Sequence, residues 1–108
     1  MEAFPRELLY YETADGKVPV RDWLDGIEGS PAYFEIVRRL DRVELGNFGD
    51  HGPVGDGVSE LRIDFGPGYR VYYGRDGLDF VILLVGGSKK GQQGDIEAAK
   101  EYWRDYNA

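Results

Sequence analysis

The chain has 108 residues, 42% of them hydrophobic and 31% charged, with no cysteine and a single histidine, His51. This size and composition predict one small globular domain spanning residues 1–108. The lack of cysteine excludes disulfide bridges, thiolate zinc sites and cysteine nucleophiles. The longest apolar run, residues 80–85, is too short to cross a membrane, and the acidic N-terminal residues do not resemble a secretory signal. We therefore expect a cytoplasmic protein.

The charge is unevenly distributed along the chain. The formal net charge of −7 argues against a general attraction to nucleic acid. Residues 1–61 hold six basic and thirteen acidic residues, whereas residues 62–94 hold five basic and three acidic ones. Positive charge is thus concentrated in the middle of the sequence.

The N-terminal half predicts a strand followed by two helices. Residues 6–13 have strand-like composition, and residues 19–29 begin with proline and carry an apolar stripe that a glycine closes. Residues 31–46 repeat this pattern, and residues 47–57 contain four glycines and a proline, which is typical of a loop. Three arginines are expected on the outer face of the second helix: Arg38, Arg39 and Arg42.

The C-terminal half predicts an antiparallel meander and a final helix. Residues 58–65 alternate apolar and polar side chains, residues 66–68 form a turn, and residues 69–75 return as a second strand. Residues 80–85 are continuously apolar, as in a strand covered on both faces, and a helix starts at about Asp95. The order predicts an α+β domain: an N-terminal strand and two helices, then an antiparallel three-stranded meander and a C-terminal helix.

A hairpin centred on Pro67 would place Asp64 opposite Arg70, Arg62 opposite Tyr72, and Ile63 opposite Val71. Its polar face would then gather two arginines, and the loop after the last strand could add Lys89 and Lys90. Guanidinium and ammonium groups in one place predict an anion site that suits phosphate. The alternative is structural: Asp64 and Arg70 form a cross-strand ion pair, and Arg62 lies along Tyr72.

Two further features suggest a function from the sequence. The glycines of residues 86–91 could form a phosphate-binding nest, although the spacing of a P-loop is missing. Histidine is the residue type whose ordinary charge change suits acid–base catalysis at neutral pH, but the single histidine, His51, lies in the glycine-rich segment, which the sequence does not place relative to the hairpin.

Three motifs in order carry a resemblance to a known family: ELRI (60–63), GPGYRVYY (66–73) and GGSK..Q..DI (86–96). With the flanking residues, they resemble the RelE/HigB-type toxins, in the branch of phage-derived addiction module killer proteins. The resemblance implies a RelE-like α+β fold and a toxin of a type II toxin–antitoxin system. Such toxins are endoribonucleases, or mRNA interferases, that cleave ribosome-bound mRNA. They use no metal or cofactor, and a small helix-turn-helix antitoxin from the same operon holds them inactive.

The resemblance also implies roles for particular residues. Arg62 and Arg70 would bind the phosphate that the 2′-OH attacks, while Lys89 moves protons and Tyr72 stacks on a base. Asp64 stands where relatives carry a second basic residue, and Asp95 lies near C-terminal catalytic positions, so either is an alternative general base. The residues expected to contact RNA are Tyr72, Lys90, Gln93 and Asp64.

A second hypothesis comes from the same resemblance. The acidic net charge and the lack of a histidine after the last strand depart from the toxin pattern. They are compatible with a catalytically inactive protein of this fold that binds its antitoxin and acts as an operon co-repressor.

Overall fold

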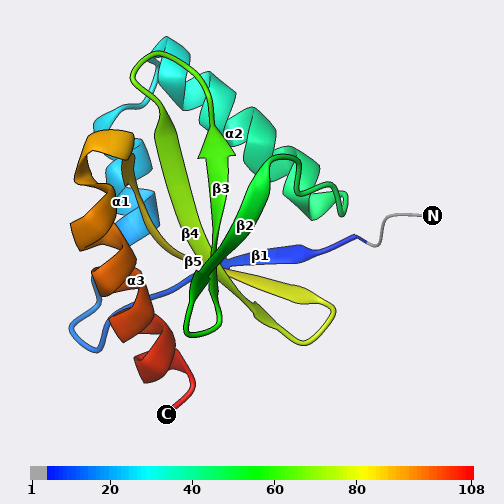
Figure 1. Ribbon diagram of the computed structural model, residues 1–108, viewed down its shortest axis with the longest axis vertical. Helices are drawn as coiled ribbons and strands as arrows, with labels where there is room; N and C mark the ends of the chain where they lie inside the picture. The colour runs from blue at the N-terminus through cyan, green and yellow to red at the C-terminus, as the bar shows by residue number, and fades with distance from the viewer. Residues whose placement is uncertain (1–4) are drawn as a thin grey trace.

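A computed structural model describes residues 5–108 as one α+β unit. Figure 1 shows a mixed sheet with helices packed on it. The elements in chain order are β1 (Glu7–Tyr10), α1 (Pro19–Gly26), α2 (Pro31–Glu44), β2 (His51–Gly55), β3 (Val58–Ile63), β4 (Tyr69–Asp76), β5 (Phe80–Ser88), a 3₁₀ turn (Lys89–Gly91) and α3 (Gln92–Tyr106). None of the helices in the described range has the length and apolar content needed to cross a bilayer.

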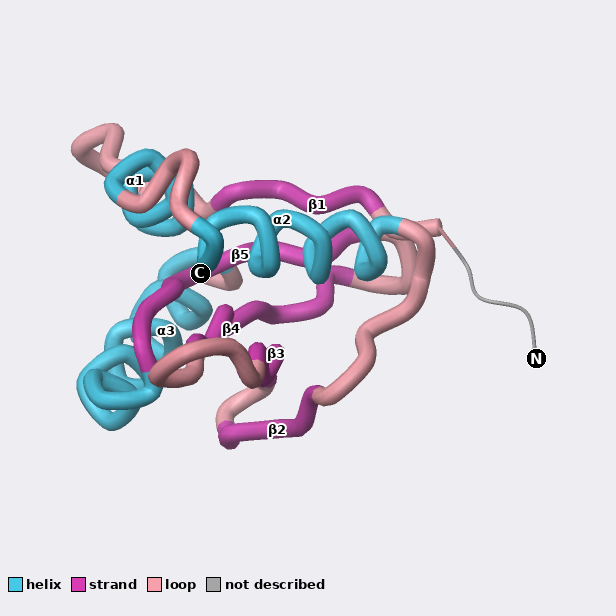
Figure 2. Tube along the Cα trace, turned by 90° about the horizontal axis from the view of Figure 1, so that it is seen from above, coloured by secondary structure: helices cyan, strands magenta, loops and turns pink. Residues whose placement is uncertain are grey.

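The sheet has five strands in the order β1-β5-β4-β3-β2, which Figure 2 shows in sequence across the molecule. β1 runs parallel to β5, and the other neighbours are antiparallel. The predicted meander is present as β3, β4 and β5. The predicted α+β class is confirmed, but the prediction of four strands is wrong because β2 adds one.

β2 lies in the segment that was expected to be a loop. Its residues pair antiparallel with β3, and the connection is Asp56-Gly57, both with positive φ (57° and 84°). This is the two-residue turn that favours hairpins. The prediction missed this strand because the segment is rich in glycine, which is typical of loops. An edge strand of this kind is held by backbone hydrogen bonds rather than by apolar side chains, so it leaves no apolar pattern in the sequence. Pro53 is tolerated because β2 is an edge strand.

The sheet separates two cores, one on each face. One face packs against α1 and α2 through a cluster that includes Ile36, Leu61 and Val71, all with no exposed surface. The other face packs against α3 through a cluster that includes Tyr72, Leu84 and Ala99. α2 and α3 therefore lie apart from each other, as Figure 1 shows. Burial of both faces of β5 confirms the prediction made from its unbroken apolar run.

The helices begin where the sequence predicts, with one exception. Ser30 caps α2 by accepting the Tyr33 N–H at 3.1 Å, and Gly46 follows the helix with φ of 92°. α3 starts at Gln92 rather than near Asp95, directly after the 3₁₀ turn.

β5 continues through Gly86 and Gly87 to Ser88, so these glycines belong to a strand. A side chain at Gly86 would collide with Trp23 of α1, and one at Gly87 would collide with Asp95 of α3. The glycines are therefore required by helices that press on both faces. The interpretation of this pair as part of a phosphate-binding nest is wrong.

Candidate anion site

The β3–β4 hairpin sets the position of the candidate site, and its register differs from the predicted one. Arg62 lies opposite Arg70, and Leu61 lies opposite Val71. The predicted pairs of Asp64 with Arg70, Arg62 with Tyr72 and Ile63 with Val71 are therefore wrong by two positions. The connection runs from residue 64 to residue 68 and is centred on Gly66 rather than Pro67. Because the shift is even, every side chain keeps its predicted face.

The hairpin turn bends toward the residue that follows β5. Gly66 and Gly68 have φ of 55° and 89°, a conformation that favours glycine. The Gly68 carbonyl accepts the Lys89 backbone N–H at 2.9 Å. A Cβ atom at Gly68 would lie 3.5 Å from Lys89 Cβ and 3.9 Å from Arg70 Nη1. Gly68 thus lies next to both the lysine and the arginine, and its positive φ, rather than a lack of space, is what favours glycine there.

These residues surround a hollow of about 270 Å³. Its lining comprises Asp50, Arg62, Asp64, Gly66, Pro67, Gly68, Arg70 and Lys89. Two arginines and one lysine from three separate parts of the chain therefore line the same hollow, as the sequence predicts. Two carboxylates share the same lining, so the hollow is polar with mixed charge rather than uniformly basic.

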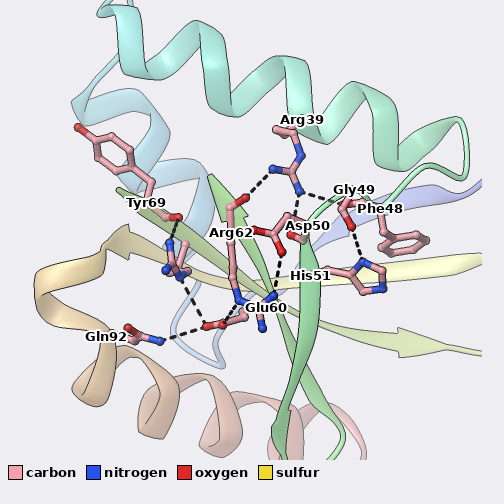
Figure 3. A network of polar contacts seen from close by, with 10 residues as sticks. Arg39, Phe48, Gly49, Asp50, His51, Glu60, Arg62, Tyr69 and Gln92 are labelled. Atoms are coloured by element: carbon pink, nitrogen blue, oxygen red, sulfur yellow. Dashed lines mark hydrogen bonds and ion pairs between the residues drawn. The ribbon is translucent and has the colours of Figure 1, made fainter. Parts of the chain in front are cut away.

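Glu60 is the buried centre of this arrangement. Its side chain is 7% exposed, and its carboxylate accepts a hydrogen bond from Arg62 Nε at 2.9 Å and one from Gln92 Nε2 at 3.2 Å. The Nε of Arg70, whose side chain is 11% exposed, lies 3.8 Å from the same carboxylate. Figure 3 shows Glu60 between Arg62 and Gln92. One carboxylate therefore separates two arginines that face each other across the strand pair and would otherwise repel.

Arg62 is held from a second side by the segment before β2. Its Nη1 donates to Asp50 Oδ1 at 2.9 Å, and the hydrogen bonds to Asp50 and Glu60 raise the pKa of Arg62 above its ordinary value. A Cβ atom at Gly52 would lie 2.7 Å from Arg62 Nη2. The missing side chain at Gly52 therefore provides the space in which the guanidinium lies.

Arg39 fixes this segment from the opposite face of the sheet. Its guanidinium donates to the carbonyls of Arg62, Phe48 and Asp50 at 2.6, 2.9 and 3.1 Å (Figure 3). The prediction that Arg39 lies on the outer face of α2 is therefore wrong, whereas Arg38 and Arg42 are exposed as expected. Burial lowers the pKa of Arg39, and the three carbonyls accept hydrogen bonds from both terminal nitrogens of this partly buried guanidinium.

Tyr72 is not available to the hollow. It has no exposed surface and lies in the core under α3. Burial raises its pKa to about 12, and its hydroxyl has no hydrogen-bond partner among the described residues. The prediction that Tyr72 stacks on an RNA base is therefore wrong for this structure. The polar strand face that was expected to be open is covered by the N-terminal part of α3.

The remaining predicted residues are divided between the hollow and its surroundings. Asp64 lies beyond the end of β3, exposed, on the rim of the hollow, and it forms no ion pair with Arg70. Lys90, in the 3₁₀ turn, and Gln93, at the start of α3, are exposed and do not line the hollow. Asp95 is half-buried against Gly87, and this burial raises its pKa.

His51 lies on the other side of the sheet. It pairs with Leu61, whose side chain packs toward α2, and its Nδ1 lies 2.7 Å from the Gly49 carbonyl (Figure 3). The pairing puts it on the face opposite Arg62 and Arg70.

Sequence reasoning missed three residues of this site: Glu60, Asp50 and Arg39. For Glu60 a signal was present, because an acid two positions before Arg62 on a strand shares its face. Asp50 and Arg39 had no such signal, since their contacts depend on the unexpected strand β2.

Comparison with known proteins gives one relative. A Haemophilus influenzae (strain ATCC 51907 / DSM 11121 / KW20 / Rd) protein, described as an uncharacterized protein, is 47% identical over 78 residues, which is 72% of this chain and 79% of the relative. No family model matches the chain, and no solved structure matches it. The identity and the coverage show that the chain belongs to the same family as this Haemophilus protein.

Proposed function

We propose that this protein is the toxin of a type II toxin–antitoxin system, with a RelE-like fold and metal-independent endoribonuclease activity on mRNA, ribosome-bound mRNA in particular. One observation carries the proposal: Arg62, Arg70 and Lys89 line a single hollow. Three cationic donors around a space of about 270 Å³ suit a phosphate group of an RNA chain. The motif resemblance supplies the reaction.

The reaction would be an internal transesterification. The ribose 2′-oxygen bonds to phosphorus, the bond from phosphorus to the 5′-oxygen breaks, and the products are a 2′,3′-cyclic phosphate and a 5′-hydroxyl. A base must take the 2′-OH proton, and an acid must give one to the leaving 5′-oxygen. Charge that develops on the non-bridging oxygens would be stabilised by Arg70 and Arg62.

The geometry favours one of the alternative proton carriers over the other. Asp64 is exposed on the rim of the hollow beside Arg62 and Lys89, whereas Asp95 does not line it. Asp64 is therefore the better placed general base, with Lys89 as the acid. Glu60 is already bound to both arginines and Gln92, and it acts as a positioning residue.

Inducible expression in a bacterial host tests the proposal. Wild-type protein should arrest growth, while Arg70→Ala should lose activity by at least about 100-fold, the cost of removing one transition-state hydrogen-bond donor. Because Arg70 is largely buried, Lys89→Ala serves as the exposed second variant, and Arg38→Ala on the outside of α2 is the control. Arrest that survives both Arg70→Ala and Lys89→Ala would show that the hollow is not the active site.

A second function has one observation in its favour. Asp50 and Glu60 already pair with Arg62, and Glu60 also pairs with Arg70, so the arginines have counter-charges without RNA. An inactive toxin-fold protein that binds its antitoxin and represses its operon would tolerate this. Cleavage of mRNA on purified ribosomes separates the two, because the inactive protein leaves the message intact.

A further inference from the structure

A second concave surface lies away from the hollow, at the free edge of the sheet. A groove of about 300 Å³ separates β1 from α1 and α2. It is lined by Leu8, Tyr10, Leu24, Tyr33, Val37, Leu40, Asp41 and Glu44. The floor is largely apolar, while the two acids of α2 are exposed at one side.

The backbone of β1 has unused hydrogen-bonding groups beside this groove. Glu7 donates to the Asp79 carbonyl at 2.7 Å and Tyr11 donates to the Leu83 carbonyl at 3.0 Å, so the odd residues face β5. The N–H and C=O groups of Leu8 and Tyr10 therefore point to the other side. β1 is the last strand of the sheet there, and within residues 5–108 no strand covers that edge. The same two residues line the groove with their side chains.

The edge is closed at one end. The Arg6 N–H, which is the next outward group, donates to the Glu44 carbonyl of α2 at 2.7 Å. An added strand would therefore lie along Leu8 and Tyr10 and extend in the other direction. Tyr10 is 45% exposed and Leu9 is 36% exposed, so β1 is not fully covered in that direction.

The charge around this groove favours a basic partner protein over a second copy of the chain. A second copy of the chain docked edge to edge would bring acids of its own, on a molecule with a net charge of −7, against Glu7, Asp41 and Glu44. Like charges placed opposite one another disfavour such a pair. A segment carrying lysine or arginine would instead be attracted to the same rim.

We propose that the β1 edge and this groove bind an extended segment of a basic partner protein, which adds to the sheet as a further strand. The side chains on one face of the segment point toward the groove: apolar ones enter it beside Leu8 and Tyr10, and basic ones reach Asp41 and Glu44 at its side. Main-chain hydrogen bonds to Leu8 and Tyr10 provide affinity, and the groove provides selectivity. The surface shares no residue with the hollow, so this proposal stands apart from the nuclease proposal.

The probes are two capped synthetic peptides of equal length that alternate outward-facing threonine with groove-facing residues; the groove-facing residues are valine and lysine in one peptide and valine and glutamate in the other. The lysine peptide should slow hydrogen exchange of the Leu8 and Tyr10 amides by at least about tenfold, whereas the glutamate peptide should not. Protection that is absent from both amides at saturating lysine peptide would overturn the proposal.

Two variants separate the edge from simple attraction to an acidic protein. Leu8→Pro removes an N–H that points away from β5, so the sheet keeps its pairing and the edge loses a donor. It should weaken the lysine peptide by about tenfold or more, while Leu8→Val should not. The double variant Asp41→Lys with Glu44→Lys, at exposed helix positions, should reverse the preference toward the glutamate peptide.

Unchanged affinity and preference in the double variant would contradict the proposal even where Leu8→Pro fails to fold. Lys89→Ala, which lies in the hollow, should leave peptide binding intact. Loss of arrest with normal peptide binding would therefore affect the nuclease proposal alone.

Discussion

The two faces of the β3–β4 hairpin bury different kinds of side chain. On the face toward α2, Leu61 and Val71 have no exposed surface and form an apolar core. On the face toward α3, the charged side chains of Glu60 and Arg70 are almost as buried, with 7% and 11% of their surface exposed. Buried ion pairs add little net stability compared with apolar packing. The difference indicates that the second face fixes the positions of charged groups rather than supplying stability.

The largest effect is expected on the apolar face. Leu61→Ala removes a fully buried side chain and should lower the free energy of unfolding by about 2–5 kcal/mol, measured by urea denaturation. A loss below about 1 kcal/mol would mean that this face is not the main core.

Removing the carboxylate of the charged face should cost less stability. Glu60→Gln keeps the shape of the side chain but leaves Arg70 without its buried counter-charge, so the free energy of unfolding should fall by about 1–3 kcal/mol. The same variant should lose growth arrest, because the two arginines lose their common partner. Full arrest with Glu60→Gln would contradict the positioning role of Glu60.

Tyr72 tests whether the charged face is closed by α3. Its hydroxyl has no partner, so Tyr72→Phe should leave stability at pH 7 unchanged or raise it by up to about 1 kcal/mol. Because the folded-state pKa of Tyr72, about 12, exceeds the unfolded value of 10, the contribution of Tyr72 to wild-type stability should be constant below pH 10 and be lost between pH 10 and 12.

Tyr72→Phe should make the fall in stability over this pH range shallower, as followed by denaturation at stepped pH. Tyr11, whose pKa burial also raises to about 12, leaves part of the slope in place. An unaltered slope in Tyr72→Phe would show that this ring is not buried as described.

The smallest effect is expected at the exposed rim. Asp50→Asn removes a negative charge from the hollow and leaves Glu60 as the remaining ion-pair partner of Arg62. The affinity for a short single-stranded RNA should rise by up to about fivefold at low salt. A fall in affinity would mean that Asp50 orients Arg62 for RNA rather than competing with it.

Much of the fold was predictable because its signals are local. The proline starts of α1 and α2, the alternation in β3 and the apolar run of β5 each appear in a short window of sequence. β2 was missed because its stability depends on pairing with β3, which no short window contains.

The part of the site that could be predicted is the part that depends only on the alternation of side chains along a strand. Arg62 and Arg70 share a face whichever even register is chosen, and Lys89 follows the neighbouring strand. The burial of Tyr72 and the network around Glu60 were not predictable, because they depend on where α3 begins and how it crosses the sheet.

The central claim is that Arg70 and Lys89 act on one phosphate. A double-mutant cycle measures this directly, with the affinity of a short all-2′-deoxy oligonucleotide, which resists this cleavage, determined for wild type, Arg70→Ala, Lys89→Ala and the double variant. A shared phosphate predicts that the two losses are coupled by at least about 0.5 kcal/mol. Losses that add within about 0.3 kcal/mol would show that the two cations bind separately.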